Sequence, residues 1–223
     1  MFPLYDENRT KTRPYITWIL IIVNVLVFLW QWSRGLSDSD FINYGAIPLF
    51  ILRGKELSTL LTSMFMHGGI WHIFGNMLYL FIFGDNIEDR FGHIKYLIIY
   101  LVFGVIAGLT HSWFSVQAGG YDAIIPVVGA SGAISGVLGA YVVLYPRARI
   151  ATIIFLGYFG RIIKIPSIFM LGFWFIMQLL YSFLDPYSNI AFWAHIGGFI
   201  IGFIVAIPFK ITKTRTQRNW YNN

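Results

Sequence analysis

Residues 129–135 read GASGAIS, and this stretch lies inside a run that carries no charged residue from Ala123 to Pro146. A run of that length is typical of a helix inside a membrane, where small residues allow helices to approach closely. The serine between the glycines, Ser131, has two interpretations. It serves helix packing, or it is a nucleophile that works inside the bilayer.

The composition of the whole chain indicates a membrane protein. Of its 223 residues 57% are hydrophobic and 12% are charged, whereas soluble domains carry about 25% charged residues. The chain has no cysteine, which excludes thiol catalysis, disulfides and thiolate metal sites. The net charge of +6 is spread over short loops and tails beside apolar runs, and this fits membrane topology better than a nucleic-acid surface.

Six charge-free stretches are long enough to cross a bilayer, which takes about 20 mostly apolar residues. They lie between Arg13 and Arg34, Glu56 and Asp85, Lys95 and Asp122, Asp122 and Arg147, Lys164 and Asp185, and Asp185 and Lys210. The apolar segment 150–160 is too short to cross and is expected to lie in the membrane interface. We therefore expect an all-α polytopic membrane protein, a compact bundle of six transmembrane helices.

The distribution of Lys and Arg predicts the orientation of the chain. These residues concentrate in both tails and in the loops after the second and fourth spans, and the loops after the third and fifth spans have none. Since cytoplasmic loops carry the excess of positive charge, both termini are expected in the cytoplasm. The expected organisation is a cytoplasmic tail over residues 1–14, a membrane domain over 15–209 with a long outer loop at about 33–66, and a basic cytoplasmic tail over 210–223. The expected location is the plasma or inner membrane of a cell.

The helix that begins at Ser131 is expected to be short, because Pro146 stops it after about 15 residues, or about 22 Å. The hydrocarbon core is about 30 Å thick, so this fourth helix would begin below the outer surface. The Gly-rich backbone before it would then be irregular, which is tolerated at that depth only where it is buried or lines a watery cavity. Ser131 is therefore expected at a helix N-terminus, in a pocket that water reaches.

Polar groups within the spans are functional candidates by default. His72 and Asn76 are four residues apart, so they share one helix face near the outer end of the second span. His195 begins the sixth span from the same side, and Ser131 begins the fourth. All ten Asp and Glu residues are expected in loops or tails, which excludes an intramembrane aspartyl dyad, and no HExxH motif of a zinc protease is present.

These groups suit acyl transfer by a Ser–His dyad. A serine hydroxyl needs a neighbouring base to take its proton, and a neutral histidine is the natural base near pH 7. With no carboxylate expected in a span, the pair Ser131 and His195 is the most that the chain can build. An oxyanion needs N–H donors, and the candidates are the Ser131 amide at its helix N-terminus, the Asn76 amide and a ring N–H of His72.

Helix packing agrees with this pairing. Gly132, Gly136 and Ala140 recur every four residues on the fourth span, and Gly198 and Gly202 do so on the sixth. Faces of small residues at this spacing let two helix backbones approach closely. Packing and catalysis are therefore complementary interpretations of the same glycines.

Together these pieces resemble the rhomboid intramembrane serine proteases in their basic six-span bacterial form. The matching stretches come in the family's order within residues 15–209, and they are HGGIWHIFGN (67–76), GDNIEDRFG (84–92), GASG (129–132) and AHIGG (194–198). The resemblance implies a hydrolase that cuts transmembrane segments of other proteins near the outer face. It implies Ser131 as nucleophile and His195 as general base, with an oxyanion hole of His72, Asn76 and the Ser131 amide. It further implies supporting roles for His67, Gly129, Gly132 and Gly198.

One departure from the family pattern concerns the histidine. Family members often carry an aromatic residue four positions after the nucleophile, stacked on the catalytic histidine, and here that residue is Ser135. What orients His195 therefore stays open. The expected partners are transmembrane protein substrates and the lipid bilayer. We expect no nucleic-acid partner, no cofactor and no metal ion.

Three other functions compete with the protease. A catalytically weak or inactive relative that binds transmembrane clients would be expected to lack the serine or the histidine, and both are present; it stays the alternative. A small transporter with broken helices would need a repeat or a buried carboxylate for ion coupling, and neither is apparent. A zinc hydrolase using His67, His72 and His195 would lack a carboxylate base.

Overall fold

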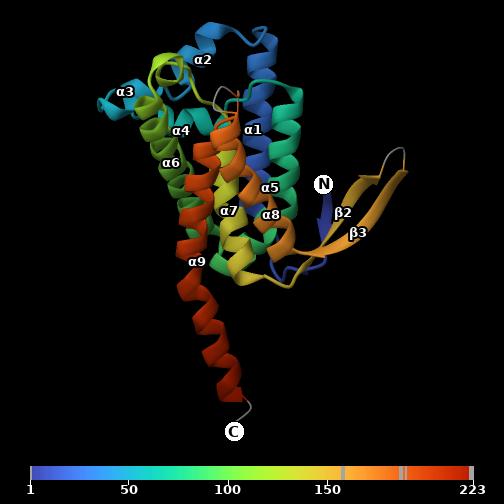
Figure 1. Ribbon diagram of the computed structural model, residues 1–223. Helices are drawn as coiled ribbons and strands as arrows, with labels where there is room; N and C mark the ends of the chain where they lie inside the picture. Colours follow the sequence, from blue (N-terminus) through green and yellow to red (C-terminus); the bar gives the residue numbers. More distant parts are fainter. Residues whose placement is uncertain (1, 157–158, 186–187, 189, 221–223) are drawn as a thin grey trace.

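The computed structural model of the chain describes residues 2–156, 159–185, 188 and 190–220. This part is mostly helical, and its longer helices pack around one buried helix, α7 (Figure 1). They are α1 (Tyr15–Ser33), α5 (Ile70–Phe91), α6 (His93–Ala118), α7 (Ser131–Leu144), α8 (Ser167–Leu184) and α9 (Phe192–Trp220).

The expected outer loop folds over one end of this bundle. It forms short helical segments, drawn at the top of Figure 1, namely α2 (Asp38–Tyr44), α3 (Pro48–Leu52), α4 (Thr59–Thr62) and η1 (Ser63–Phe65). A further turn, η2 (Gly120–Ala123), precedes α7. The loop holds the irregular backbone before α7, because Ala46 bridges to Val127 and the amide of Gly129 donates to the carbonyl of Ser63 at 2.9 Å.

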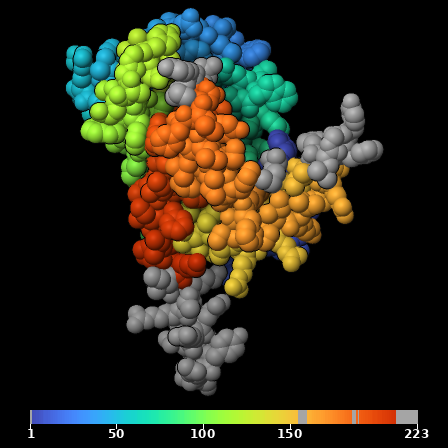
Figure 2. All heavy atoms as spheres, viewed as in Figure 1, coloured from blue at the N-terminus to red at the C-terminus, as the bar shows by residue number. Residues whose placement is uncertain are grey.

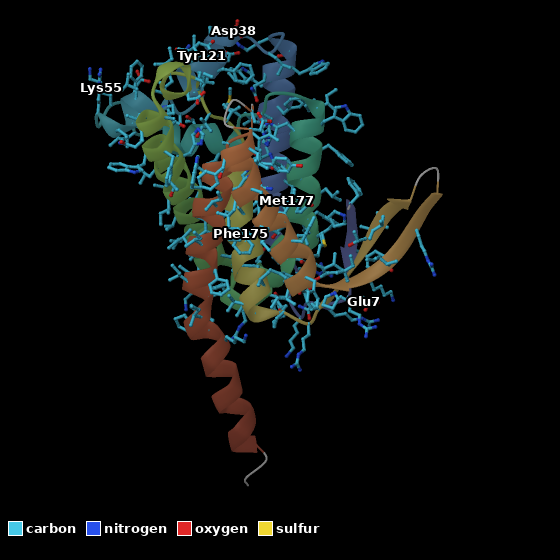
Figure 3. The ribbon with its side chains drawn as sticks, in the orientation of Figure 1. Glu7, Asp38, Lys55, Tyr121, Phe175 and Met177 are labelled. Atoms are coloured by element: carbon cyan, nitrogen blue, oxygen red, sulfur yellow. The ribbon has the colours of Figure 1, made fainter. Side chains whose placement is uncertain are left out.

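The chain is a multi-pass membrane protein. Among the described residues, four helices are long and apolar enough to cross a bilayer, and α7 is a shorter apolar helix. The four stretches are Tyr15–Ser33, His93–Ala118, Ser167–Leu184 and Phe192–Lys210. The two other expected spans, over α5 and α7, stay predictions. Figure 3 shows how polar residues mark the two ends of the bundle, with Asp38, Lys55 and Tyr121 at one end and Glu7 near the other.

The expectation that every carboxylate lies in a loop or tail is wrong. Asp85, Glu88 and Asp89 lie in the last turns of α5, and Glu88 is fully buried. The Glu88 carboxylate accepts hydrogen bonds from the backbone amides of Ile16 and Thr17, at 2.9 and 2.8 Å, and from the Thr17 hydroxyl at 2.7 Å. The free N–H groups at the start of α1 therefore stabilise a buried negative charge that the sequence pattern does not reveal. This buried carboxylate removes one of the two sequence arguments against the transporter alternative, and the absence of an apparent sequence repeat is the argument that stays.

The expected all-α architecture is also wrong in one part. An antiparallel sheet with the order β1-β2-β3 stands at the side of the bundle (Figures 1 and 2). Its strands are β1 (Phe2–Asp6), β2 (Arg149–Leu156) and β3 (Phe159–Pro166). Residues 150–156 and 159–160 of the stretch expected in the interface thus lie in β2 and β3, because β-branched residues such as Ile150, Thr152 and Ile153 favour extended backbone.

Both terminal segments carry regular secondary structure. Residues 2–6 pair with β2, from Phe2 opposite Ile153 to Asp6 opposite Ile150. At the other end, α9 continues past residue 210 as far as Trp220, with Pro208 inside the helix. The helix extends well beyond the rest of the bundle in Figure 1.

The small-residue faces of α7 and α9 meet. A Cβ atom on Gly198 would collide with the carbonyl oxygen of Gly132, and one on Gly202 would collide with that of Gly136. Only glycine permits backbones to approach this closely. The contact fixes the start of α9 beside the start of α7.

Candidate active site

Ser131 is the first residue of α7, at the end of the bundle covered by the outer loop. Gly129, two residues earlier, has a φ angle of +125°, a conformation that favours glycine. As the first helical residue, Ser131 has a backbone N–H without an acceptor inside its own helix. The hydroxyl and a free amide of the same residue therefore lie together at a helix N-terminus.

His195, in the first turn of α9, contacts that hydroxyl. Its Nε2 atom lies 2.8 Å from Ser131 Oγ, although the two residues are 64 positions apart in the sequence. The close contact of Gly132 with Gly198 brings the two helix starts within this reach. A serine hydroxyl bonded to an imidazole nitrogen is the arrangement in which the histidine can take the serine proton.

The other ring nitrogen of His195 also has a partner. Nδ1 lies 2.8 Å from Oε1 of Gln178 on α8. The indole ring of Trp174, one turn earlier on α8, lies 5.8 Å from the imidazole ring with an interplanar angle of 37°. Ser135 does not fill this place, because its hydroxyl donates to the Ser131 carbonyl at 2.6 Å. As a polar residue in a charge-free span, Gln178 is a secondary candidate from the sequence without a specific role, whereas no sequence signal indicates Trp174.

Two side-chain donors from α5 converge near Gly129. The amide of Gly68 donates to His72 Nδ1 at 3.3 Å, so the ring proton of a neutral His72 lies on Nε2. A Cβ atom on Gly129 would lie 2.7 Å from His72 Nε2 and 3.7 Å from Asn76 Nδ2. Among the described residues the buried Asn76 Nδ2 has no hydrogen-bond partner. A buried N–H donor without an acceptor is costly, and here it lies beside the loop that leads to Ser131.

His67 lies against His72 rather than in the donor pair. Its ring contacts that of His72 edge to face, with centroids 5.1 Å apart, and its side chain is fully buried. Gln31 of α1 clamps the backbone of His67, accepting from its amide at 3.0 Å and donating to its carbonyl at 3.3 Å. This clamp fixes the chain just before α5 and therefore the position of His72.

A small cavity of about 30 Å³ adjoins Ser131. Its polar lining includes Ser63, Ser112 and His111, and Nε2 of His111 lies 3.1 Å from the Ser115 hydroxyl. That volume is enough for one water molecule, which needs about 10–15 Å³ of such space and several polar partners. Within the described part of the chain, no group of three or more His, Asp or Glu side chains could hold a metal ion.

Comparison with known proteins identifies the family of the chain. A family model described as "Rhomboid domain" matches residues 54–211, which is more than half of the chain. The chain belongs to the rhomboid family. The matched rhomboid domain contains both members of the Ser–His pair, both donors on α5 and Gln178.

The rhomboid relatives come from bacteria and from eukaryotes. Rhomboid protease GluP of Bacillus subtilis is 32% identical over 222 residues, which covers 94% of this chain and 39% of the relative. The human presenilin-associated rhomboid-like protein, mitochondrial, is 35% identical over 158 residues, covering 70% of this chain and 38% of the relative. Rhomboid protein 1, mitochondrial, of Saccharomyces cerevisiae is 31% identical over 152 residues, covering 65% and 41%. The chain spans between 38% and 54% of the length of these and five further curated relatives.

Proposed function

We propose that the chain is an intramembrane serine endopeptidase that hydrolyses peptide bonds in or near transmembrane segments of other proteins. Ser131 is the nucleophile and His195 the general base. The observation that carries the proposal is the 2.8 Å contact between Ser131 Oγ and His195 Nε2. Membership of the rhomboid family and a relative named as a rhomboid protease support it.

The first half-reaction forms an acyl-enzyme. His195 Nε2 takes the proton of Ser131 as Oγ attacks the peptide carbonyl, and the resulting oxyanion accepts from the Ser131 amide, His72 Nε2 and Asn76 Nδ2. The imidazolium then gives its proton to the leaving amine. The unpartnered Asn76 amide gains its acceptor in this step.

The second half-reaction consumes water. A water molecule loses a proton to His195 as it attacks the acyl carbon, and Ser131 leaves with that proton restored. The cavity beside Ser131 has room for such a molecule. Hydrolysis inside a membrane therefore depends on a small pocket at the start of α7, whose mostly apolar lining includes a few polar side chains.

The proposed membrane arrangement has six spans, formed by α1, α5, α6, α7, α8 and α9, with both termini in the cytoplasm. Ser131 would then lie in the outer half of the bilayer, below the outer loop. A substrate helix must unwind locally before its carbonyl reaches Oγ, because a helical carbonyl is already hydrogen-bonded. We therefore expect preferred cleavage near helix-breaking residues and after small ones.

The test is cleavage of a single-span substrate in liposomes by the parent chain, Ser131→Ala and His195→Ala. Loss of cleavage in both variants, with unchanged thermal unfolding, is the expected result. Ser135→Ala is the matched control, because it removes another hydroxyl from the same helix and only a bond to the Ser131 carbonyl. Cleavage that persists in Ser131→Ala would overturn the proposal.

A further inference from the structure

Both ring nitrogens of His195 are engaged, and they have different kinds of partner. Nε2 faces the Ser131 hydroxyl and Nδ1 faces the side-chain carbonyl oxygen of Gln178, each at 2.8 Å. We propose that Gln178 is the positioning residue that holds His195 in its proton-accepting tautomer, an inference that rests on the proposed protease function. It replaces the orienting carboxylate of a catalytic triad with a neutral amide.

The chemistry of the amide oxygen selects the tautomer. Oε1 of Gln178 accepts hydrogen bonds and cannot donate one, so Nδ1 of a neutral His195 must carry the ring proton. Nε2 then has its lone pair free, directed at Ser131 Oγ. Only this tautomer can take the serine proton, since the opposite one would carry its single ring proton on Nε2 and present a donor to the hydroxyl.

The amide itself is held in the required orientation. Nε2 of Gln178 donates to the carbonyl of Trp174, one turn earlier on α8, at 3.4 Å. This bond directs the carbonyl end of the amide toward His195. The indole ring of Trp174 lies 5.8 Å from the imidazole ring of His195. Two consecutive turns of α8 therefore hold the histidine, one through the Trp174 ring and the other through the Gln178 hydrogen bond.

The surroundings of Gln178 make a packing role a poor explanation. The residue is 8% exposed, and most of its neighbours along α8 are apolar. Figure 3 places its neighbours Phe175 and Met177 on α8 between the two polar ends of the bundle. A buried amide destabilises the folded protein relative to an apolar side chain unless its hydrogen bonds are made. An apolar residue of similar shape would pack at this place without that penalty.

Two substitutions separate positioning from packing. Gln178→Met keeps the length and removes the acceptor, whereas Gln178→Glu keeps an acceptor for Nδ1–H and adds a buried charge. We expect Met to lower kcat by about 10- to 100-fold with KM within about twofold, less than the roughly 100- to 10,000-fold that general acid–base catalysis contributes. We expect Glu to stay more active than Met. A packing role would give the opposite order, since Met suits an apolar site better than Glu.

The experiment measures kcat and KM for cleavage of the single-span substrate by the full chain in liposomes, with Ser131→Ala in parallel. The control requires that Ser131→Ala is inactive. Given that, a parent-like kcat in Gln178→Met, or a Gln178→Met variant more active than Gln178→Glu, overturns the positioning role of Gln178. Activity in Ser131→Ala instead overturns the proposed function itself. The two failures are therefore distinguishable.

A spectroscopic measurement tests the tautomer of His195 directly in the parent chain, so it does not depend on the folding of a Gln178 variant. The ¹⁵N spectrum of His195, assigned by comparison with His195→Ala, is expected to show a protonated Nδ1 and an unprotonated Nε2 at neutral pH. The reverse pattern would contradict the proposed tautomer. Both readouts respond to the hydrogen bond and not to the volume of the side chain.

Discussion

Asn76 is a site residue with an unsatisfied hydrogen-bond donor in the resting protein. Its buried Nδ2 has no partner among the described residues, and it lies near the same glycine as the ring N–H of His72. A donor that waits for an acceptor stabilises a charge that develops during the reaction without first breaking another bond. The unsatisfied amide and the proposed oxyanion hole are thus one feature.

Asn76→Ala is expected to lower kcat by about 100- to 1000-fold with little change in KM, because the lost bond forms chiefly in the transition state. Thermal unfolding of the variant is expected at the same or a higher temperature, since an unpaired buried donor destabilises the fold. Steady-state cleavage kinetics and calorimetry of the same preparation check both parts. An equal rise in KM with unchanged kcat would contradict a role in the transition state.

At the scale of helices, the decisive contact is the one between α7 and α9. It depends on the absence of a Cβ atom at Gly198, where the neighbouring backbone of Gly132 leaves no space. The same contact sets the distance between Ser131 and His195. Stability and activity are therefore coupled at this glycine.

Gly198→Ala is expected to destabilise the chain by about 1–3 kcal/mol, the usual effect of overpacking. It is also expected to abolish most cleavage, because the two helix starts must separate. Gly172→Ala on α8 is the matched control, since a Cβ there would meet nothing within 4 Å. Thermal unfolding and cleavage assays of both variants test the coupling, and parent-like activity in Gly198→Ala would refute it.

At the scale of the whole molecule, the N-terminal segment ties the sheet to the helix bundle. The Asp6 carboxylate, at the end of β1, accepts from the Tyr141 hydroxyl on α7 and from Asn86 on α5, the latter at 2.9 Å. Burial raises the pKa of Asp6 above its ordinary value, and these hydrogen bonds offset the shift only in part. The Asp85 carboxyl group lies near enough to interact electrostatically with Asp6.

The raised pKa predicts how stability changes with pH. In the window between the ordinary pKa of 3.8 and the raised value, the folded chain binds a proton at Asp6 that the unfolded chain does not. The contribution of Asp6 to stability therefore falls as the pH rises through this window and increases on acidification. We expect a smaller dependence of the unfolding temperature on pH in Asp6→Asn than in the parent. If the unfolding temperature of Asp6→Asn differs between pH 7 and pH 4 by as much as that of the parent, Asp6 is excluded as the source of the pH dependence.

The membrane orientation is open to a direct test, because the chain has no cysteine of its own. A single cysteine at Lys55→Cys is expected to react with a membrane-impermeant maleimide added outside intact cells. One at Arg147→Cys is expected to react only after permeabilisation. Both parent residues are exposed, so the side of the membrane decides the reactivity, and the reverse pattern would invert the proposed topology.

The sequence by itself determined the features that depend on composition and local spacing. Apolar runs separated by charges indicate a membrane protein because the bilayer acts on each segment independently. The stretches around His72, Ser131 and His195 indicated the family, and small residues at four-residue spacing indicated which helix faces approach. These signals lie within single segments, and they can therefore be recognised without knowledge of the fold.

Only the tertiary structure decided which partners complete the site and the bundle. Gln178 meets His195 because α8 packs against α9 in one rotation about its axis, which an apolar sequence does not specify. Glu88 is buried because the amides at the start of α1, 71 residues away from it at Thr17, satisfy its charge. The pairing of residues 2–6 with β2 likewise joins segments nearly 150 positions apart. Each of these contacts depends on long-range packing between complementary groups, and no periodicity within a single segment encodes it.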